Sequence, residues 1–151
     1  MERLLKFYIN GEWVVPQSIE TMPVLNPATA EQVAEVALGN AADVDVAVAA
    51  AKAAFEHFSQ TSKYERLALL RRIRLVSERR FEELAQAMRL EMGAPITMAR
   101  EAQADAAVGH LDGFIHALEK LEEQERFDNG EVVLKEPIGV CGLITPWNWP
   151  I

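Results

Sequence analysis

The sequence predicts an α/β fold that is rich in helices and ends after the first parallel strand of a core sheet. Near residue 40 the spacing of apolar residues changes from a period of two to about 3.6, and helical patterns continue to residue 123. The uncharged segment 138–144 then carries two glycines, as is typical of a parallel strand buried on both faces. Because one such strand cannot form a sheet, we expect an incomplete domain.

The first forty residues have the pattern of short strands joined by turns. Segments 6–9 and 12–15 flank Asn10-Gly11, which predicts a β-hairpin. Residues 21–25 are a further candidate for strand pairing. Asn26-Pro27 then marks a turn, and residues 32–37 alternate as a half-buried strand does.

The first two helical segments carry their own start signals. Asn40 is a candidate N-cap for the first helix, and Ser62 with Glu65 forms a capping box before the second. Each helix has an apolar face, which consists of Val44, Val48, Ala51, Phe55 and Phe58 in the first, and of Leu67, Leu70, Ile73 and Val76 in the second.

Two more helical patterns follow, after a break that we expect near Ser77. Residues 81–92 end at Gly93, which can take the left-handed C-cap conformation. Residues 97–123 form one long pattern, in which Gly109 and Gly113 either permit close packing or weaken a surface turn. The apolar stripe of this long pattern consists of Leu111, Phe114, Ile115, Leu118 and Leu121.

A turn at 128–130 and a strand at 131–136, with one polar and one apolar face, lead to Pro137 and the uncharged strand 138–144. The loop Thr145-Pro146-Trp147-Asn148-Trp149-Pro150 comes directly after it, and ligands bind beyond the carboxyl ends of strands in open α/β sheets. Asn148 can donate hydrogen bonds to a developing oxyanion without being deprotonated. From the residues alone, a rigid packing turn is an equally good interpretation.

Composition excludes several classes of function. The net charge of −8 argues against nucleic acid as a partner, and the arginines at 71–74 and 79–80 suit the solvated face of a helix. No apolar run reaches the ~18 residues of a membrane span, and the start lacks the pattern of a secretory signal. We therefore expect a cytoplasmic protein without a membrane partner.

The cysteine and histidines do not form a metal site by their spacing. Cys141 is the single cysteine, so it forms no internal disulfide, which fits a reducing compartment. His110 and His116 share a helix, but a spacing of six does not place them on one face, and His57 lies elsewhere. We expect no metal.

The segment 136–150, Glu-Pro-Ile-Gly-Val-Cys-Gly-Leu-Ile-Thr-Pro-Trp-Asn-Trp-Pro, resembles the first Rossmann strand and following loop of NAD(P)-dependent aldehyde dehydrogenases. Residues 8–13, 26–29 and 43–55 resemble the family's N-terminal hairpin, next turn and first long helix. Residues 91–95 resemble its acidic-x-Gly-Lys-Pro turn, with Ala94 where lysine is common. The resemblance covers nearly all 151 residues, but only about the first third of a full-length enzyme.

The resemblance implies that residues 1–151 are the N-terminal part of the Rossmann-like cofactor-binding domain, and that the catalytic domain lies outside this chain. Asn148 resembles the catalytic asparagine whose amide holds the oxygen of the aldehyde substrate. In the family, one segment lies along the cofactor, which is NAD or NADP. The residues that resemble this segment are Ile144, Thr145, Pro146, Trp147 and Asn148. The strand 131–136 resembles part of an oligomerisation arm, which implies a homo-oligomer.

The family's nucleophilic cysteine and general-base glutamate have no counterpart in this chain, so we expect it to be inactive alone. Cys141 lies where the family usually has a small apolar residue, and we expect it to be buried and structural. Glu91, near the backbone of Val24 and Leu25, resembles a monovalent-cation site of some members, but a solvated carboxylate is the preferred interpretation, because few ligands can be named.

Two other classes of function remain open. A non-catalytic helical interaction module derived from the same fold would also suit a chain that ends here. Another nicotinamide enzyme with a similar strand is disfavoured, because no Gly-x-Gly-x-x-Gly follows the strand. If the chain folds alone, its unpaired strand and uncovered apolar faces predict that it is not a monomer.

Overall fold

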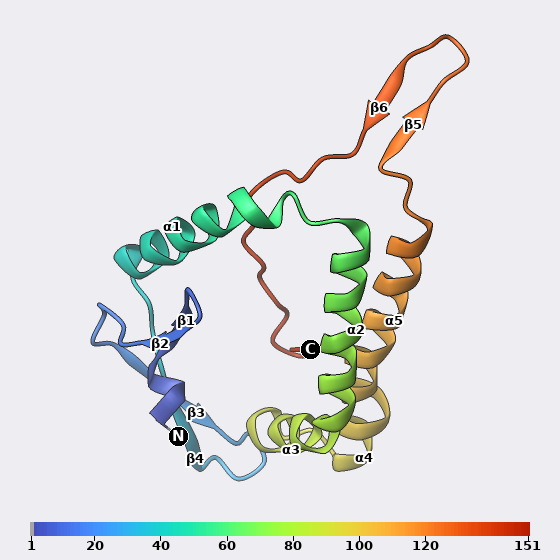
Figure 1. The fold of residues 1–151 in the computed structure, drawn as a ribbon. Coiled ribbons are helices and arrows are strands. Elements are labelled where there is room, and N and C mark those ends of the chain that lie inside the picture. Colours follow the sequence, from blue (N-terminus) through green and yellow to red (C-terminus); the bar gives the residue numbers. More distant parts are fainter. Residues whose placement is uncertain (1) are drawn as a thin grey trace.

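The computed structural model describes residues 2–151 and forms an open frame rather than a filled layer (Figure 1). Hairpins and helices make the frame, a third hairpin projects from it, and the C-terminal segment runs through its centre. In chain order the elements are η1 (Glu2–Leu5), β1 (Phe7–Ile9), β2 (Glu12–Val14), β3 (Thr21–Leu25), β4 (Gln32–Ala37), α1 (Ala41–Phe58), α2 (Lys63–Arg79), α3 (Phe81–Met92), α4 (Ile96–Met98), η2 (Ala99–Ala104), α5 (Asp105–Lys120), β5 (Gln124–Arg126) and β6 (Val132–Leu134).

The two N-terminal hairpins follow the predicted turns. β1 and β2 pair antiparallel around Asn10 and Gly11, whose φ angles of 52° and 83° are both positive, as a type I′ turn requires. Tyr8 and Trp13 face each other across the strands, with ring centroids 5.2 Å apart. β3 pairs antiparallel with β4, and the register shifts at Val24 and Leu25.

The N-terminus of α1 is fixed by side-chain caps. Asn40 accepts hydrogen bonds from the amides of Ala42 and Asp43, which confirms it as the N-cap. The Asp43 carboxylate is buried and accepts from the amides of Gln17 at 2.7 Å and Asn40 at 3.0 Å. These hydrogen bonds lower the pKa of Asp43, and the bond from Gln17 has the largest effect. The bond from Gln17 also connects α1 to the segment after β2.

α1 forms as predicted, but its apolar face stays open. The side chains of Val44 and Phe58 are 57% and 51% exposed. The period of 3.6 therefore identified the helix correctly, while the packing within residues 2–151 leaves this face largely exposed.

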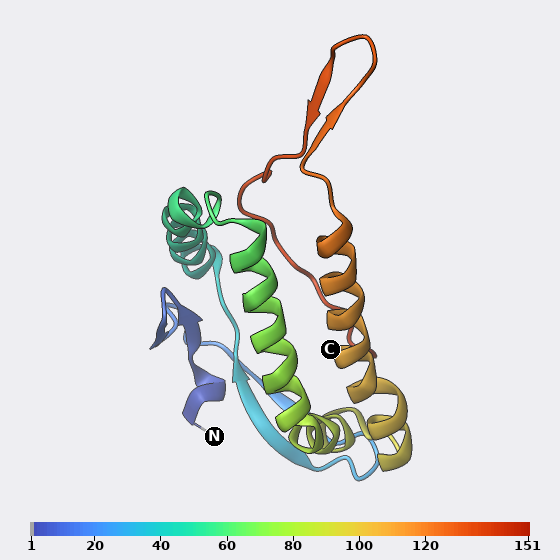
Figure 2. The same ribbon diagram turned by 45° about the vertical axis from the view of Figure 1, so that its right-hand side comes forward.

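α2 and α5 lie side by side in both views (Figures 1 and 2). Ser62 and Glu65 form the predicted capping box, and Leu67 is buried. Further along the helix the predicted stripe opens to solvent, since Ile73 is 43% exposed. Two ion pairs join these helices, Arg71–Glu119 and Arg74–Asp112. A third ion pair links Arg66 of α2 to Glu123, just beyond the end of α5.

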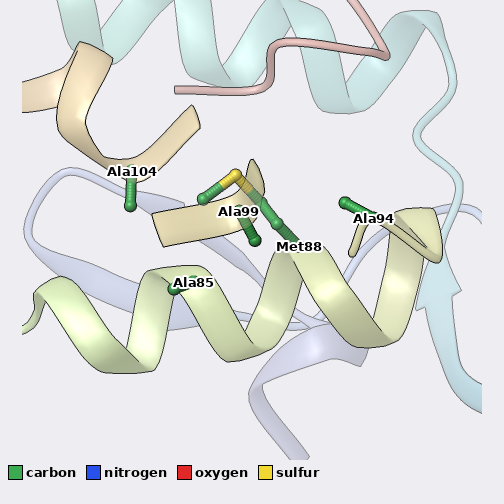
Figure 3. Packing of buried hydrophobic residues seen from close by; sticks show 5 residues of the cluster. All are labelled: Ala85, Met88, Ala94, Ala99 and Ala104. Atoms are coloured by element: carbon green, nitrogen blue, oxygen red, sulfur yellow. The ribbon is translucent and has the colours of Figure 1, made fainter. Parts of the chain in front are cut away.

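The predicted break near Ser77 occurs later, because α2 continues to Arg79 and turns at Arg80. The pattern at 97–123 is also interrupted: α4 leads into the π-helical turn η2, and α5 ends at Lys120. The core lies where α3 meets η2 and consists mostly of alanines, which allow these two elements to approach closely (Figure 3). Its buried members are Ala85, Met88, Ala94, Ala99 and Ala104.

The C-terminal region differs most from the prediction. β6 lies within the predicted strand 131–136 and pairs with β5, which the sequence analysis did not anticipate. All three β6 residues are exposed, so neither face is covered.

The predicted strand 138–144 is irregular, and Ile144 is 98% exposed. A strand needs a neighbour for its backbone hydrogen bonds, and no strand within residues 2–151 pairs with this segment. Cys141, predicted to be buried, is consequently exposed. Among the described residues, no helix has both the length and the apolar character to cross a bilayer.

Gly93 and Gly113 should respond to alanine with opposite signs. Gly93 has a φ of 65°, and an added Cβ would lie 2.7 Å from Pro27 Cγ. Gly93→Ala should therefore destabilise the fold by about 1–3 kcal/mol. Gly113 lies inside α5 with open space around it, so Gly113→Ala should stabilise by about 0.5–1 kcal/mol. Denaturant unfolding measures both, and a neutral Gly93→Ala would contradict the assigned close approach.

Candidate functional site

The loop that follows segment 138–144 occupies the middle of the frame. Figure 1 shows the C-terminal segment leaving the projecting hairpin and ending between the helices. The chain bends at 147–149. Trp147, Pro150 and Ile151 line one side of a pocket of about 350 Å³. The opposite wall comes mainly from α3, so the loop lies against this helix.

The pocket wall is mostly apolar and has one carboxylate. Met88, Met92 and Leu84 supply apolar surface from α3, and Glu91 supplies the charge. Val24 of β3 lines the same pocket as Glu91, and Glu91 is exposed. Among residues 2–151, no three His, Cys, Asp or Glu side chains gather in a way that could hold a metal ion.

A buried glutamine holds the bend of the loop. Gln103 is 1% exposed, and its Nε2 donates to the backbone oxygen of Asn148 at 2.9 Å. The same nitrogen lies 3.9 Å from Met92 Sδ. Gln103 belongs to η2, so the π-helical turn and the loop are directly connected.

An ion pair joins α3 to the same turn. Two guanidinium nitrogens of Arg100, Nε and Nη2, donate to the Glu82 carboxylate at 2.9 and 2.7 Å. The pKa of Glu82 is lowered to about 2, mainly by the hydrogen bonds from Arg100 and to a smaller extent by one from Gln86. The same pairing raises the pKa of Arg100. This pair lies on the outside of the contact between α3 and η2, whose inside is packed with alanines.

All the candidate residues from the sequence lie on one continuous exposed segment. Ile144 is 98% and Trp147 86% exposed, and the side chains of Thr145, Pro146 and Asn148 also face solvent. Such a segment leaves backbone and side-chain groups available to a ligand.

Sequence reasoning missed Gln103. The available signal was a single uncharged polar residue within an alanine-rich helical stretch, at 99–107. Its partner lies 45 residues away, so only the fold reveals the contact.

The model of the aldehyde dehydrogenase family matches residues 13–151, so the chain belongs to the aldehyde dehydrogenase family. A 3-succinoylsemialdehyde-pyridine dehydrogenase from a Pseudomonas species is 44% identical over 147 residues, which is 97% of this chain and 31% of the relative. The chain thus spans about a third of the length of the curated relatives it matches.

Solved structures of aldehyde dehydrogenases match the fold of this chain along almost its whole length. An aldehyde dehydrogenase from Pseudomonas syringae, complexed with NAD+ and octanal, has a TM-score of 0.94 and 48% identity over 98% of this chain and 30% of its own. A betaine aldehyde dehydrogenase from Staphylococcus aureus in complex with NAD+ has a TM-score of 0.89 and 29% identity, over 99% of this chain and 31% of its own. The helix-rich α/β fold is therefore that of part of an aldehyde dehydrogenase.

The Glu82–Arg100 pair should make the free energy of unfolding depend on pH in the acidic range. Because folding lowers the pKa of Glu82 from 4.5 to about 2, the pair stabilises the fold above pH 4.5 and loses this contribution as the pH falls toward 2. Arg100→Gln should return the pKa of Glu82 toward 4.5, as followed by NMR titration of its carboxyl carbon. Arg79→Gln, at the end of α2, is the control and should leave the titration unchanged. A wild-type midpoint near 4.5 would contradict the pairing.

Proposed function

We propose that this chain is the N-terminal part of the cofactor-binding domain of an NAD-dependent aldehyde dehydrogenase, which oxidises an aldehyde to a carboxylic acid. The observation that carries the proposal is the exposed loop 145–150, which presents Asn148 while Gln103 holds its backbone. The NAD+ complexes of related enzymes support the choice of NAD as cofactor.

Asn148 is the proposed oxyanion donor. As the carbonyl carbon of an aldehyde is attacked, negative charge accumulates on its oxygen, and an amide N–H stabilises this charge without giving up a proton. The donor must stand at a fixed position before the reaction, because a group that has to reorganise loses much of its advantage. The contact between Gln103 and the loop supplies such a restraint.

The segment from Ile144 to Asn148 is the proposed cofactor contact. It carries no charged side chain, its backbone is not engaged in a sheet, and Trp147 is largely exposed beside it. These properties fit a cofactor that lies along the segment through backbone contacts and a flat apolar wall. Bound NAD+ would accept the hydride from the substrate. In this proposal the residues of this chain bind and orient the cofactor and the substrate. The nucleophile and the general base, as the resemblance implies, lie outside residues 1–151.

The projecting hairpin β5–β6 is the proposed oligomerisation arm. It extends away from all other elements in both views, and Val133 and Leu134 are 46% and 59% exposed (Figures 1 and 2). Free strand edges with apolar side chains pair with another chain. A homo-oligomer in which this arm contacts a second subunit would cover the free strand edges and their apolar side chains. The single cysteine supports a reducing compartment, the cytoplasm, which fractionation of cells would test.

In the full-length enzyme, Asn148→Ala should lower kcat by about 10²–10³, the usual loss for one oxyanion donor. KM should change much less, because the amide acts mainly on charge that develops in the transition state. Asn148→Asp, which keeps the shape but removes the donor, should show a comparable loss. Steady-state kinetics under chemistry-limited conditions measure both, and wild-type turnover in either variant would overturn the proposed oxyanion role of Asn148.

The isolated 151-residue chain should self-associate and should not reduce NAD+. Association follows from the uncovered faces of α1, α5 and the hairpin, and inactivity follows from the missing nucleophile. Light scattering at micromolar concentration and absorbance of the reduced cofactor measure the two properties on one sample. A compact monomer would contradict the proposed arm, whereas aldehyde-dependent reduction that Asn148→Ala abolishes would contradict the placement of the nucleophile.

A further inference from the structure

The π-helical turn η2 places one amide side chain deep inside the alanine contact. Ala99 and Ala104, at the two ends of the turn, are fully buried, and Gln103 between them is 1% exposed. A π turn interrupts an α-helix at a cost in hydrogen-bond geometry and is frequently found at functional sites. Here it directs an amide toward the loop rather than toward solvent.

The bond from Gln103 reaches the residue that carries the proposed chemistry. Its acceptor is the carbonyl oxygen of Asn148 itself, 2.9 Å from Nε2. Holding this oxygen restrains the peptide group after Asn148, and so limits the movement of the backbone that carries the Asn148 side chain. The rest of the bend is exposed, so this contact restrains the asparagine from the protein side.

Stability alone does not explain an amide at this position. Gln103 Oε1 is buried and has no hydrogen-bond partner within residues 2–151. A buried polar atom without a partner disfavours folding, and an unbranched apolar side chain of similar volume would fill the space without that cost. The amide is better explained by its donor, which reaches the loop.

We propose that Gln103 is a positioning residue, which holds the backbone of Asn148 so that the Asn148 amide is aligned with the substrate oxygen. This inference rests on the proposed role of Asn148. Gln103 touches neither substrate nor cofactor and acts only through the loop. Its removal should therefore weaken the same interaction that Asn148 makes, and no other.

The test is a double-mutant cycle in the full-length enzyme. Gln103→Met keeps the volume and removes the donor, so kcat should fall about 10- to 100-fold, as for a small misplacement of a catalytic group. KM should change little, because the Asn148 amide acts mainly on charge that develops in the transition state. In the Asn148→Ala background, Gln103→Met should cause no further loss of kcat, because the group it aligns is gone. Gln60→Met, at an exposed glutamine after α1, is the control and should match the wild type.

The outcomes separate the two proposals. If Asn148→Ala lowers kcat but Gln103→Met does not, or if the two losses multiply, the positioning role is overturned while the proposed function stands. If Asn148→Ala keeps wild-type turnover, the oxyanion role fails, and the positioning role fails with it. Should Gln103→Met not fold, Gln103→Asn decides, because it keeps the amide but is one methylene too short to reach the Asn148 oxygen. Wild-type kcat in this variant would overturn the inference.

Discussion

Backbone hydrogen bonding within short stretches of chain is the constraint on which this structure depends. Every strand within residues 2–151 pairs antiparallel with its nearest neighbour in sequence, and every helix closes its own bonds. The segment 138–144 has the composition of a parallel strand, which needs a partner from a distant part of the chain. With no such partner among these residues it stays irregular, and Cys141 and Ile144 stay exposed with it.

Small residues allow α3 to pack closely against η2 at one corner of the frame. Alanines let α3 and η2 approach closely, Gly93 lets the end of α3 meet Pro27, and Arg100 clamps the outside through Glu82. The loop with Asn148 is attached to this corner through Gln103 rather than to the open faces of α1 or α5. The candidate site thus rests on a closely packed contact, which suits a preorganised donor.

Signals that act over a few residues could be predicted from the sequence. Asn10-Gly11, the caps at Asn40 and Ser62, and the left-handed Gly93 all have the expected geometry, because each depends on its immediate neighbours. Burial could not be predicted in the same way, since the apolar face of α1 needs a cover that its own sequence does not contain. β5 was missed because its three residues carry no strand pattern. In the candidate site, the loop was found from its composition, whereas the contact of Gln103 with it depends on the π turn.

The π turn also sets the phase of the helix that follows it. A π turn holds one residue more than an α turn, so it acts as an insertion that rotates all later side chains by about 100°. With this rotation in place, Arg71 and Arg74 of α2 meet Glu119 and Asp112 of α5. Shortening 99–104 by a single residue would restore a regular α-helix, but it would turn both Asp112 and Glu119 away from α2 at once. The length of this segment is therefore constrained more strictly than the identity of most residues within it.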